Sequence, residues 1–218
     1  MAEKSKVKLN KFEKWFRTLR RLARVVYRPL FPYKVHGHAL PFDDGPYIFV
    51  GNHFSFCDVV FGAIASNKPV HFIAKKDLFE KGLMKKFVLK CQCIPANRDG
   101  TDVKAVMQSI KYLKGGESIV IYPEGTRNKS DEIFLPFKGG ATAISIKTQT
   151  PIVPFVQVKK IRFLRRSSVI YGEPIEFTEY YGKRLSEEDI QKCEDELREK
   201  MLQLYFELKQ ITQKGKRK

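Results

Sequence analysis

Short apolar runs alternate with amphipathic stretches along most of the chain. Strands are expected where the runs are rich in apolar and β-branched residues, at residues 46–50, 71–74, 118–123, 151–158 and 168–177. Helices are expected where apolar residues recur every three or four positions, at residues 57–66, 82–90, 102–114, 139–147 and 186–211. Strands that alternate with helices predict an α/β fold with a largely parallel central sheet flanked by helices.

The first 34 residues have a different pattern. Apolar side chains recur there at helical spacing, at Phe12, Trp15, Phe16, Leu19, Leu22 and Val26. Basic side chains fall on the opposite side, at Lys11, Lys14, Arg17, Arg20, Arg21, Arg24 and Arg28. Aromatic residues on one face and arginines on the other are typical of an amphipathic helix that lies on a membrane surface. The same pattern also fits a helix that packs on the protein's own core and leaves its charged face in water.

This change of pattern divides the chain into three parts. Residues 1–34 are expected to form a membrane-association segment, residues 35–211 the α/β domain, and residues 212–218 a basic tail. The longest stretch without Asp, Glu, Lys or Arg runs from residue 45 to residue 57, which is shorter than the roughly 20 apolar residues that a transmembrane helix needs. The basic N-terminus also lacks the apolar core of a secretory signal. Membrane contact is therefore expected to be peripheral.

Composition adds a strong positive charge to this picture. The 218 residues carry a net charge of +17, and 43% of them are hydrophobic, which is enough to build a core. The charge indicates anionic partners, which are an acidic membrane surface, acidic ligands or nucleic acid. Nucleic acid is the weaker alternative, because the chain has no recognisable DNA- or RNA-binding motif. The four cysteines form no CxxC pair, so reduced thiols and no metal site are expected.

The first candidate for chemistry is the stretch GNHFSFCD at residues 51–58, where His53 is followed five positions later by Asp58. On one continuous helix these side chains would lie about 140° apart and could not touch. A helix that begins after His53 allows contact, because Ser55 and Asp58 then fit a capping box and His53 can fold back from the turn. Asp58 would orient one imidazole nitrogen and leave the other as a base. Alternatively, Asp58 only caps the helix and His53 is an ordinary loop residue.

Three basic side chains follow other predicted strands or precede a helix. In SIVIYPEGTRNKS, the turn Glu124-Gly125-Thr126-Arg127 stands at a strand's carboxyl end, where open α/β sheets bind ligands. Arg127 could bind a phosphate through two hydrogen bonds, and Glu124 could accept hydrogen bonds from hydroxyls or pair with Arg127. Arg98 follows the short run in IPANRDG, and Lys138 precedes two glycines that open a helix. Each cation alone is also explained as a solvated charge.

Four motifs, taken together and in order, resemble those of the glycerophospholipid acyltransferases. NHFSFCD resembles the His-x4-Asp signature of that family, IPANRDG its second motif, YPEGTR its third and PIVPFV its fourth. The stretch FIAKKDLF is also similar to a family segment between the first two motifs. The second motif departs from the family's form, since Asn97 precedes Arg98 where the family has an aromatic or apolar run directly before Asp-Arg.

The resemblance implies acyl transfer from a thioester to the free sn-2 hydroxyl of lysophosphatidic acid, which gives phosphatidic acid. His53 would be the general base and Asp58 would orient it, a type of catalysis that contributes about 100- to 10,000-fold. No acyl-enzyme is implied, so Cys57 is not expected to be a nucleophile. The residues implied to bind substrate are Arg98 and Arg127 on the phosphate, Lys75 and Lys138 as weaker candidates, and Glu124, Gly125 and Thr126 of the third motif.

The implied partners agree with the charge of the chain. They are lysophosphatidic acid, an anionic membrane surface and an acidic thioester donor, either acyl-CoA or acyl carrier protein, without a metal or other cofactor. The expected location is the cytoplasmic face of a bacterial cell membrane. Two related alternatives remain open: transfer to another lysolipid or amino-lipid acceptor, and hydrolysis in which the same His–Asp pair activates water.

Overall fold

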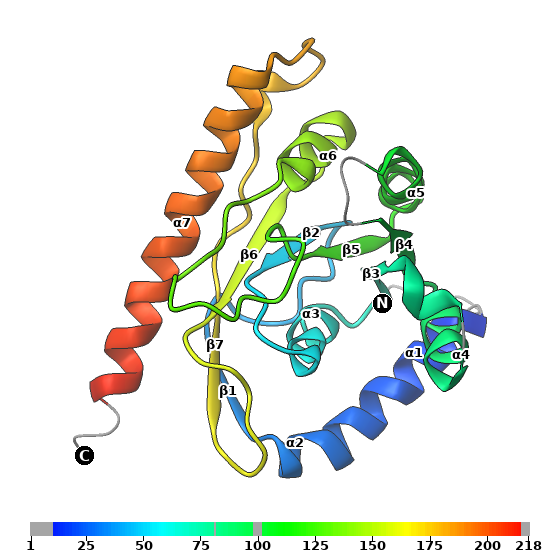
Figure 1. Cartoon of the computed structure of the whole chain (residues 1–218), viewed down its shortest axis with the longest axis vertical. Helices are drawn as coiled ribbons and strands as arrows, with labels where there is room; N and C mark the ends of the chain where they lie inside the picture. Colours follow the sequence, from blue (N-terminus) through cyan, green and yellow to red (C-terminus); the bar gives the residue numbers. More distant parts are fainter. Residues whose placement is uncertain (1–10, 81, 98–101, 215–218) are drawn as a thin grey trace, which may run out of the picture.

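The computed structural model describes residues 11–80, 82–97 and 102–214, without the side chains of residues 23 and 24. Its centre is a seven-stranded sheet in the order β1-β7-β6-β2-β5-β3-β4 (Figure 1). The strands are β1 Tyr33–Gly37, β2 Ile48–Gly51, β3 Val70–Lys75, β4 Ile94–Ala96, β5 Ser118–Ile121, β6 Ile152–Gln157 and β7 Ser167–Tyr171. All neighbouring pairs are parallel except β6 and β7. The predicted α/β fold with a largely parallel sheet is therefore confirmed.

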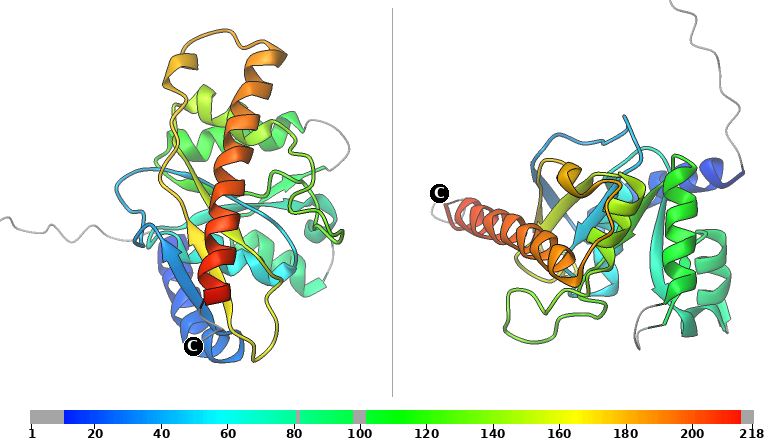
Figure 2. Two further views of the ribbon diagram at one scale, coloured as in Figure 1. Left: turned by 90° about the vertical axis from the view of Figure 1, so that its left-hand side faces the viewer. Right: turned by 90° about the horizontal axis from the view of Figure 1, so that it is seen from above.

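Helices cover both faces of the sheet (Figures 1 and 2). The α-helices are α1 Lys11–Leu22, α2 Arg28–Leu30, α3 Val59–Ile64, α4 Gly82–Lys90, α5 Val103–Lys114, α6 Gly140–Thr148 and α7 Glu187–Lys214. A π-helical turn, Ala23–Tyr27, joins α1 to α2, and short 3-10 turns lie at Phe56–Asp58, Lys76–Phe79 and Thr178–Tyr180. Helix α7 includes residues 212–214, where the basic tail was expected to begin.

The sheet is buried on both faces because successive side chains of a strand point in opposite directions. In β2, Ile48 and Val50 belong to a core that includes residues of α5, α6 and α7. Phe49, between them, belongs to a second core with residues of α1 and α3. These three residues are fully buried, which explains why the strand appears in the sequence as a continuous apolar run.

The strands that the sequence did not predict lie at the two edges of the sheet. β1 contains Lys34 and His36, and its sequence has no apolar run. β4 contains Pro95, which an edge strand tolerates because one side of it needs no hydrogen bonds. The last predicted strand is shorter than expected, since β7 ends at Tyr171, and only Ile175 pairs again, with Ile152.

Helix α1 forms as predicted, but its aromatic face is turned toward the protein. Phe12 and Phe16 are only 8% and 3% exposed and pack in the core beneath the sheet. Trp15 and Leu19 are half-buried, and the Lys90 ammonium lies 3.7 Å from the Trp15 ring. The expectation that Phe12, Trp15, Phe16 and Leu19 face a membrane is therefore wrong for Phe12 and Phe16, because the sheet already covers them.

The basic side of α1 is more exposed. Arg17 and Arg21 are in solvent, whereas Arg20 is half-buried and donates a hydrogen bond to Asn67 (3.0 Å). The side chain of Arg24 lies outside the described residues. The alternative of a helix packed on its own core thus holds for the first part of this segment.

Candidate active site

The turn after β2 brings His53 and Asp58 together. Ser55 has extended backbone angles and caps the following turn, with Asp58 closing the predicted capping box. Four donors converge on the buried Asp58 carboxylate, which are the backbone N–H groups of Phe54 (2.6 Å) and Ser55 (2.5 Å), the Ser55 hydroxyl (3.0 Å) and His53 Nδ1 (3.2 Å). Because an ionised carboxylate only accepts hydrogen bonds, this contact assigns the proton of neutral His53 to Nδ1. Asp58 therefore both caps the turn and orients the imidazole.

The loop after β5 holds the backbone of His53. His53 N–H donates to Glu124 Oε1 (3.0 Å), and Asn128 N–H donates to the His53 carbonyl (2.7 Å). The second Glu124 oxygen accepts from Leu135 N–H (2.9 Å), and the Glu124 side chain is only 2% exposed. Burial raises the pKa of the Glu124 carboxyl, although both backbone donors act in the opposite direction. Glu124 thus ties together two segments of the loop and the His53 backbone.

Two residues that the sequence analysis did not single out also position His53. The Tyr122 ring stacks on the imidazole, with the ring centres 4.2 Å apart. Asn52 exchanges side-chain hydrogen bonds with the backbone of Gln157 (2.9 and 3.0 Å), which fixes the end of β2 against β6. Both lie inside recognised motifs, Asn52 directly before His53 and Tyr122 two residues before Glu124, and this position in the sequence is the signal that could have identified them.

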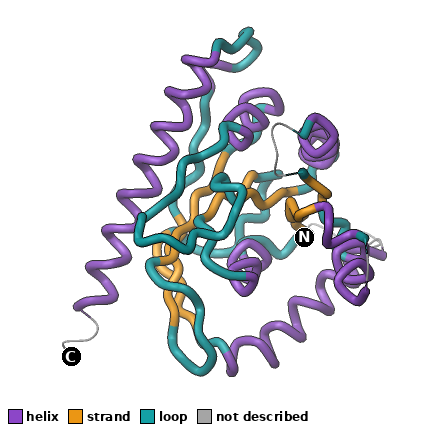
Figure 3. The backbone as a smooth tube through the Cα atoms, in the orientation of Figure 1, coloured by secondary structure: helices purple, strands orange, loops and turns teal. Residues whose placement is uncertain are grey.

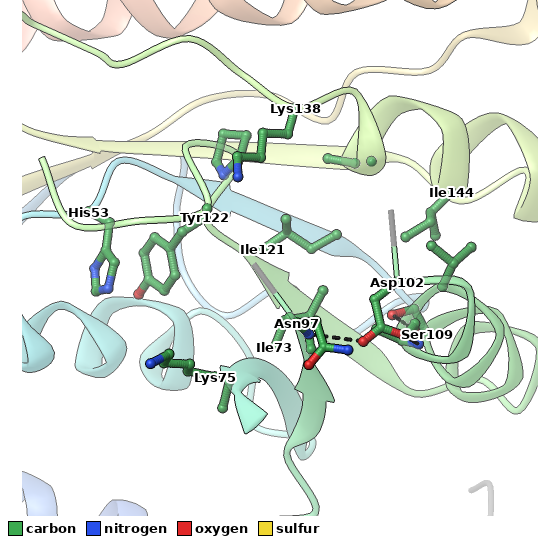
Figure 4. Close-up of a pocket in the computed structure, with 18 residues that line it drawn as sticks. His53, Ile73, Lys75, Asn97, Asp102, Ser109, Ile121, Tyr122, Lys138 and Ile144 are labelled. Atoms are coloured by element: carbon green, nitrogen blue, oxygen red, sulfur yellow. Dashed lines mark hydrogen bonds between the residues drawn. The ribbon is translucent and has the colours of Figure 1, made fainter. Parts of the chain in front are cut away.

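His53 opens into a cavity of about 420 Å³ at the carboxyl ends of β2, β3, β4 and β5 (Figure 4). One end contains His53, Tyr122, Lys75 and Lys138 (Figure 4). Its apolar walls include Ile73, Ile121, Val106 and Ile144, from β3, β5, α5 and α6. Figure 3 shows the long loop between β5 and α6 that borders the sheet at this edge. The cavity thus has a cationic end beside His53, and its other end is mostly apolar but also contains Asn97, Asp102 and Ser109 (Figure 4).

The predicted substrate-binding residues are divided by this geometry. Lys75 and Lys138 line the cavity, and Lys75 also pairs with Asp77. Gly125 lines it too, with φ of +64°, and a Cβ there would lie 3.0 Å from the Lys138 chain. Thr126 and Arg127 are exposed on the same turn but are not among the lining residues. The sequence therefore placed the right turn at the site, but the structure brings Lys138, and not Arg127, into its wall.

Two further predicted residues are not part of the wall. Glu124 faces backbone N–H groups instead of the cavity, so the expectation that it contacts substrate is not supported by its position. Arg98 lies outside the described residues, although Asn97 just before it lines the cavity. Cys57 is absent from the lining, and all four cysteines are free.

The described residues contain neither a metal-binding cluster nor a helix that could span a membrane. No group of three or more His, Cys, Asp or Glu residues there is arranged to hold a metal ion. Among the same residues, no helix has the length and apolar character needed to cross a bilayer.

Comparison with known proteins gives a consistent picture. Three curated 1-acyl-sn-glycerol-3-phosphate acyltransferases match. That of Bacillus subtilis is 30% identical and covers 62% of this chain and 69% of its own length. That of Streptococcus pneumoniae is 28% identical and covers 78% and 65%, and that of Helicobacter pylori is 34% identical and covers 56% and 52%. The chain thus spans between about half and two thirds of these relatives' lengths.

The fold has a counterpart among solved structures. The crystal structure of the 1-acyl-sn-glycerophosphate (LPA) acyltransferase PlsC from Thermotoga maritima matches with a TM-score of 0.64 at 22% identity, covering 88% of this chain and 79% of that one. A family model described as Acyltransferase matches residues 32–158. Because that match covers more than half of the chain, including the turn at His53 and the loop after β5, the chain belongs to the acyltransferase family.

Proposed function

We propose that the protein transfers an acyl chain from a thioester to the free sn-2 hydroxyl of lysophosphatidic acid and so makes phosphatidic acid. The names of the matching relatives support this acceptor. The observation that carries the proposal is the contact between Asp58 Oδ2 and Nδ1 of His53, which lines a cavity that also contains Lys75 and Lys138. A base, two lysines and apolar lining side chains match the hydroxyl, the phosphate and the acyl chain of the substrates.

The reaction needs no covalent intermediate on the protein. His53 Nε2 takes the hydroxyl proton as the hydroxyl oxygen attacks the thioester carbonyl carbon. The tetrahedral intermediate then expels the thiolate, which receives the proton from the imidazolium. Asp58 holds the ring in the required orientation and stabilises its charged form, as the carboxylate does in other catalytic His–Asp pairs.

Substrate binding follows from the lining of the cavity. Lys75 and Lys138 are the described cations in its wall, and we assign the acceptor phosphate to them. Arg127, exposed on the adjoining turn, and Arg98 are the second choice from the family motifs. The apolar side chains of β3, β5, α5 and α6 offer a surface for an acyl chain.

The physical state of the substrates suggests where the enzyme works. The acceptor is an anionic lipid in a bilayer, and both acyl-CoA and acyl carrier protein are acidic and water-soluble. A chain with a net charge of +17 is attracted to both sides of this interface. We therefore propose peripheral attachment at the cytoplasmic face of a bacterial membrane.

The test measures acyl transfer by the purified full chain with lysophosphatidic acid, offering acyl-CoA and acyl carrier protein in parallel. We expect phosphatidic acid from at least one donor, and a loss of about 100- to 10,000-fold in kcat for His53→Ala. Cys57→Ser is the matched control in the same turn and should keep wild-type activity. Wild-type activity in His53→Ala would refute the mechanism. Activity confined to an uncharged lysolipid would select another acceptor, and release of free fatty acid without transfer would select a hydrolase.

A further inference from the structure

One end of the molecule carries apolar side chains that the core does not use. They come from the end of the N-terminal helical segment, residues 22–30, and from the tip of the hairpin between β6 and β7, residues 159–166 (Figures 1 and 2). Their exposed fractions are 59% for Leu22, 72% for Val25, 50% for Val26, 38% for Leu30, 59% for Phe163 and 63% for Leu164. We call these two segments together the helix–hairpin surface.

Direct contacts join the two segments into one surface. Leu164 N–H donates a hydrogen bond to the Leu30 carbonyl (2.7 Å). The rings of Phe31 and Phe163 meet edge to face, with their centres 5.8 Å apart. The exposed side chains of Leu30, Phe163 and Leu164 are therefore neighbours, although more than a hundred residues of chain separate them. Contiguous exposed apolar area of this kind marks an interaction site more often than isolated apolar residues do.

The residues at the hairpin tip are unusual for such a turn. The backbones of Arg162 and Arg165 form an antiparallel β-bridge across the turn, which leaves Phe163 and Leu164 as its two central residues. Two-residue hairpin turns favour Gly, Asn and Asp, because central positions take positive φ. Leu164 has φ of +53°, a region that a branched apolar residue rarely occupies. An exposed apolar pair in this conformation indicates a role outside folding.

The two segments of this surface carry charge of one sign. Its exposed cations are Arg28, Lys159, Lys160, Arg162, Arg165 and Arg166, and the exposed Arg21 directly precedes it. The sequence contains no Asp or Glu between Glu13 and Asp43, and none between Glu132 and Glu173. Exposed apolar side chains among cations are complementary to an anionic bilayer, where charge attracts the protein and apolar groups enter the headgroup region.

We propose that the helix–hairpin surface docks the protein on an anionic lipid membrane. The exposed aliphatic and aromatic side chains of both segments enter the interface, and the arginines and lysines contact lipid phosphates. This surface shares Leu22 and Val26 with the apolar face that the helical pattern indicates, but it excludes the buried Phe12 and Phe16 and adds the hairpin tip. The proposal rests on the proposed function for the need to reach a membrane lipid, but its test requires no substrate.

The helix–hairpin surface is also connected to the active-site turn. Tyr27, inside the N-terminal segment, donates a hydrogen bond from its hydroxyl to the Cys57 carbonyl (3.2 Å). Cys57 lies between the capping residue Ser55 and the carboxylate of Asp58. Docking through residues 22–30 therefore fixes the position of the catalytic turn relative to the membrane.

The test compares two double variants of the full chain in vesicle co-sedimentation, with phosphatidylcholine vesicles that contain or lack phosphatidylglycerol. Phe163→Ser with Leu164→Asn removes the hairpin's apolar pair without changing charge, and Asn tolerates the positive φ of position 164. The matched control is Val103→Thr with Met107→Gln, which alters two equally exposed apolar residues on α5. We expect the hairpin variant to bind anionic vesicles about tenfold or more weakly, with the control unchanged.

Several outcomes would overturn the proposal. They are wild-type binding by the hairpin variant, equal losses in both double variants, equal binding of the wild type to neutral vesicles, or stronger retention on duplex DNA than on anionic vesicles at physiological salt. Circular dichroism of both variants is the control for correct folding. Acyl transfer to lysophosphatidic acid in detergent micelles separates the two proposals. If the wild type docks but transfers no acyl chain, docking stands and the proposed function fails.

Discussion

The catalytic turn at residues 53–58 and the helix–hairpin surface hold their functional groups in opposite ways. Asp58 is fully buried, and four donors fix its carboxylate. The helix–hairpin surface instead consists of several exposed side chains that are either apolar or positively charged. Proton transfer requires the base and its partners to be held in one arrangement, shielded from water. Attraction to a bilayer is a sum of weak terms that tolerates the loss of any one. Single substitutions should therefore have large effects in the turn and small effects on the surface.

The largest effect is expected from Asp58→Asn. Phe54 N–H, Ser55 N–H and His53 Nδ1 all donate to one oxygen, Asp58 Oδ2, so the amide either turns its N–H₂ toward these donors or offers them an uncharged, weaker acceptor. In both cases the imidazolium loses the negative charge that stabilises it. We expect a loss of about 100-fold or more in kcat and of about 1–3 kcal/mol in the free energy of unfolding. Steady-state kinetics and urea unfolding measure the two. If the variant binds anionic vesicles like the wild type, the catalytic turn and the helix–hairpin surface act separately. A loss of vesicle binding together with activity would contradict this separation.

The next largest effect is expected at Phe16. This residue lies on the same helix as Leu22 of the helix–hairpin surface, but it is buried in the core. Phe16→Ala leaves a cavity in the core and should lower the free energy of unfolding by about 3–5 kcal/mol. At a temperature where the variant is folded, vesicle binding should match the wild type. A variant with wild-type stability and weak vesicle binding would show that α1 releases its aromatic face to the membrane, and the comparison would fail.

Glu124→Gln distinguishes a positioning role from substrate binding. Glu124 accepts from the backbone of His53 and Leu135, so the substitution places one amide N–H₂ against a backbone donor. We expect unfolding to be easier by about 1–3 kcal/mol, with kcat reduced and the KM for lysophosphatidic acid unchanged. An increase in KM with unchanged kcat would instead support contact with the glycerol part of the acceptor.

Tyr27→Phe tests the link between the two regions. It removes the hydroxyl that bonds to the Cys57 carbonyl and keeps the ring that stacks on Phe31 (4.7 Å between ring centres). The expected cost is about 0.5–1.5 kcal/mol of stability. Activity on vesicles should fall several-fold, while vesicle binding itself stays constant. A loss of binding equal to the loss of activity would mean that Tyr27 acts only through the surface.

The smallest effect is expected from one substitution on the surface. Val26→Ser changes a side chain that is 50% exposed, so stability should change by less than about 0.5 kcal/mol. Binding to anionic vesicles should weaken only a few-fold, because the other apolar side chains remain. Thermal unfolding and vesicle sedimentation check both values. A loss of all binding from Val26→Ser would show that the surface depends on one residue and is not redundant.

Several features of the site followed from the sequence because they are local. Ser55 and Asp58 are three residues apart, and the capping box they form depends on the backbone of one turn. The loops after β2 and β5 were expected at one edge because parallel strands end on the same side. The apolar runs of the central strands identified the sheet for a similar reason, since burial on both faces leaves only apolar positions.

Other features depended on contacts between segments far apart in the chain. β1 and β4 are strands because of their pairing with β7 and β3, and their short sequences carry little strand signal of their own. Glu124 turned out to bind backbone N–H groups because Leu135 and the turn at His53 both pack against it. Nothing in the order of residues within YPEGTR separates a side chain that faces a cavity from one that faces the backbone.

The N-terminal helix shows where the limit lies. Its periodicity determined that one face must leave water, because apolar side chains gain free energy wherever they are shielded from it. The same periodicity cannot distinguish the protein's own sheet from a lipid bilayer, since both shield apolar groups equally well. The tertiary structure decided this by placing Phe12 and Phe16 against the sheet, and by extending the helix past the edge of the core so that Val25, Val26 and the hairpin tip remain exposed.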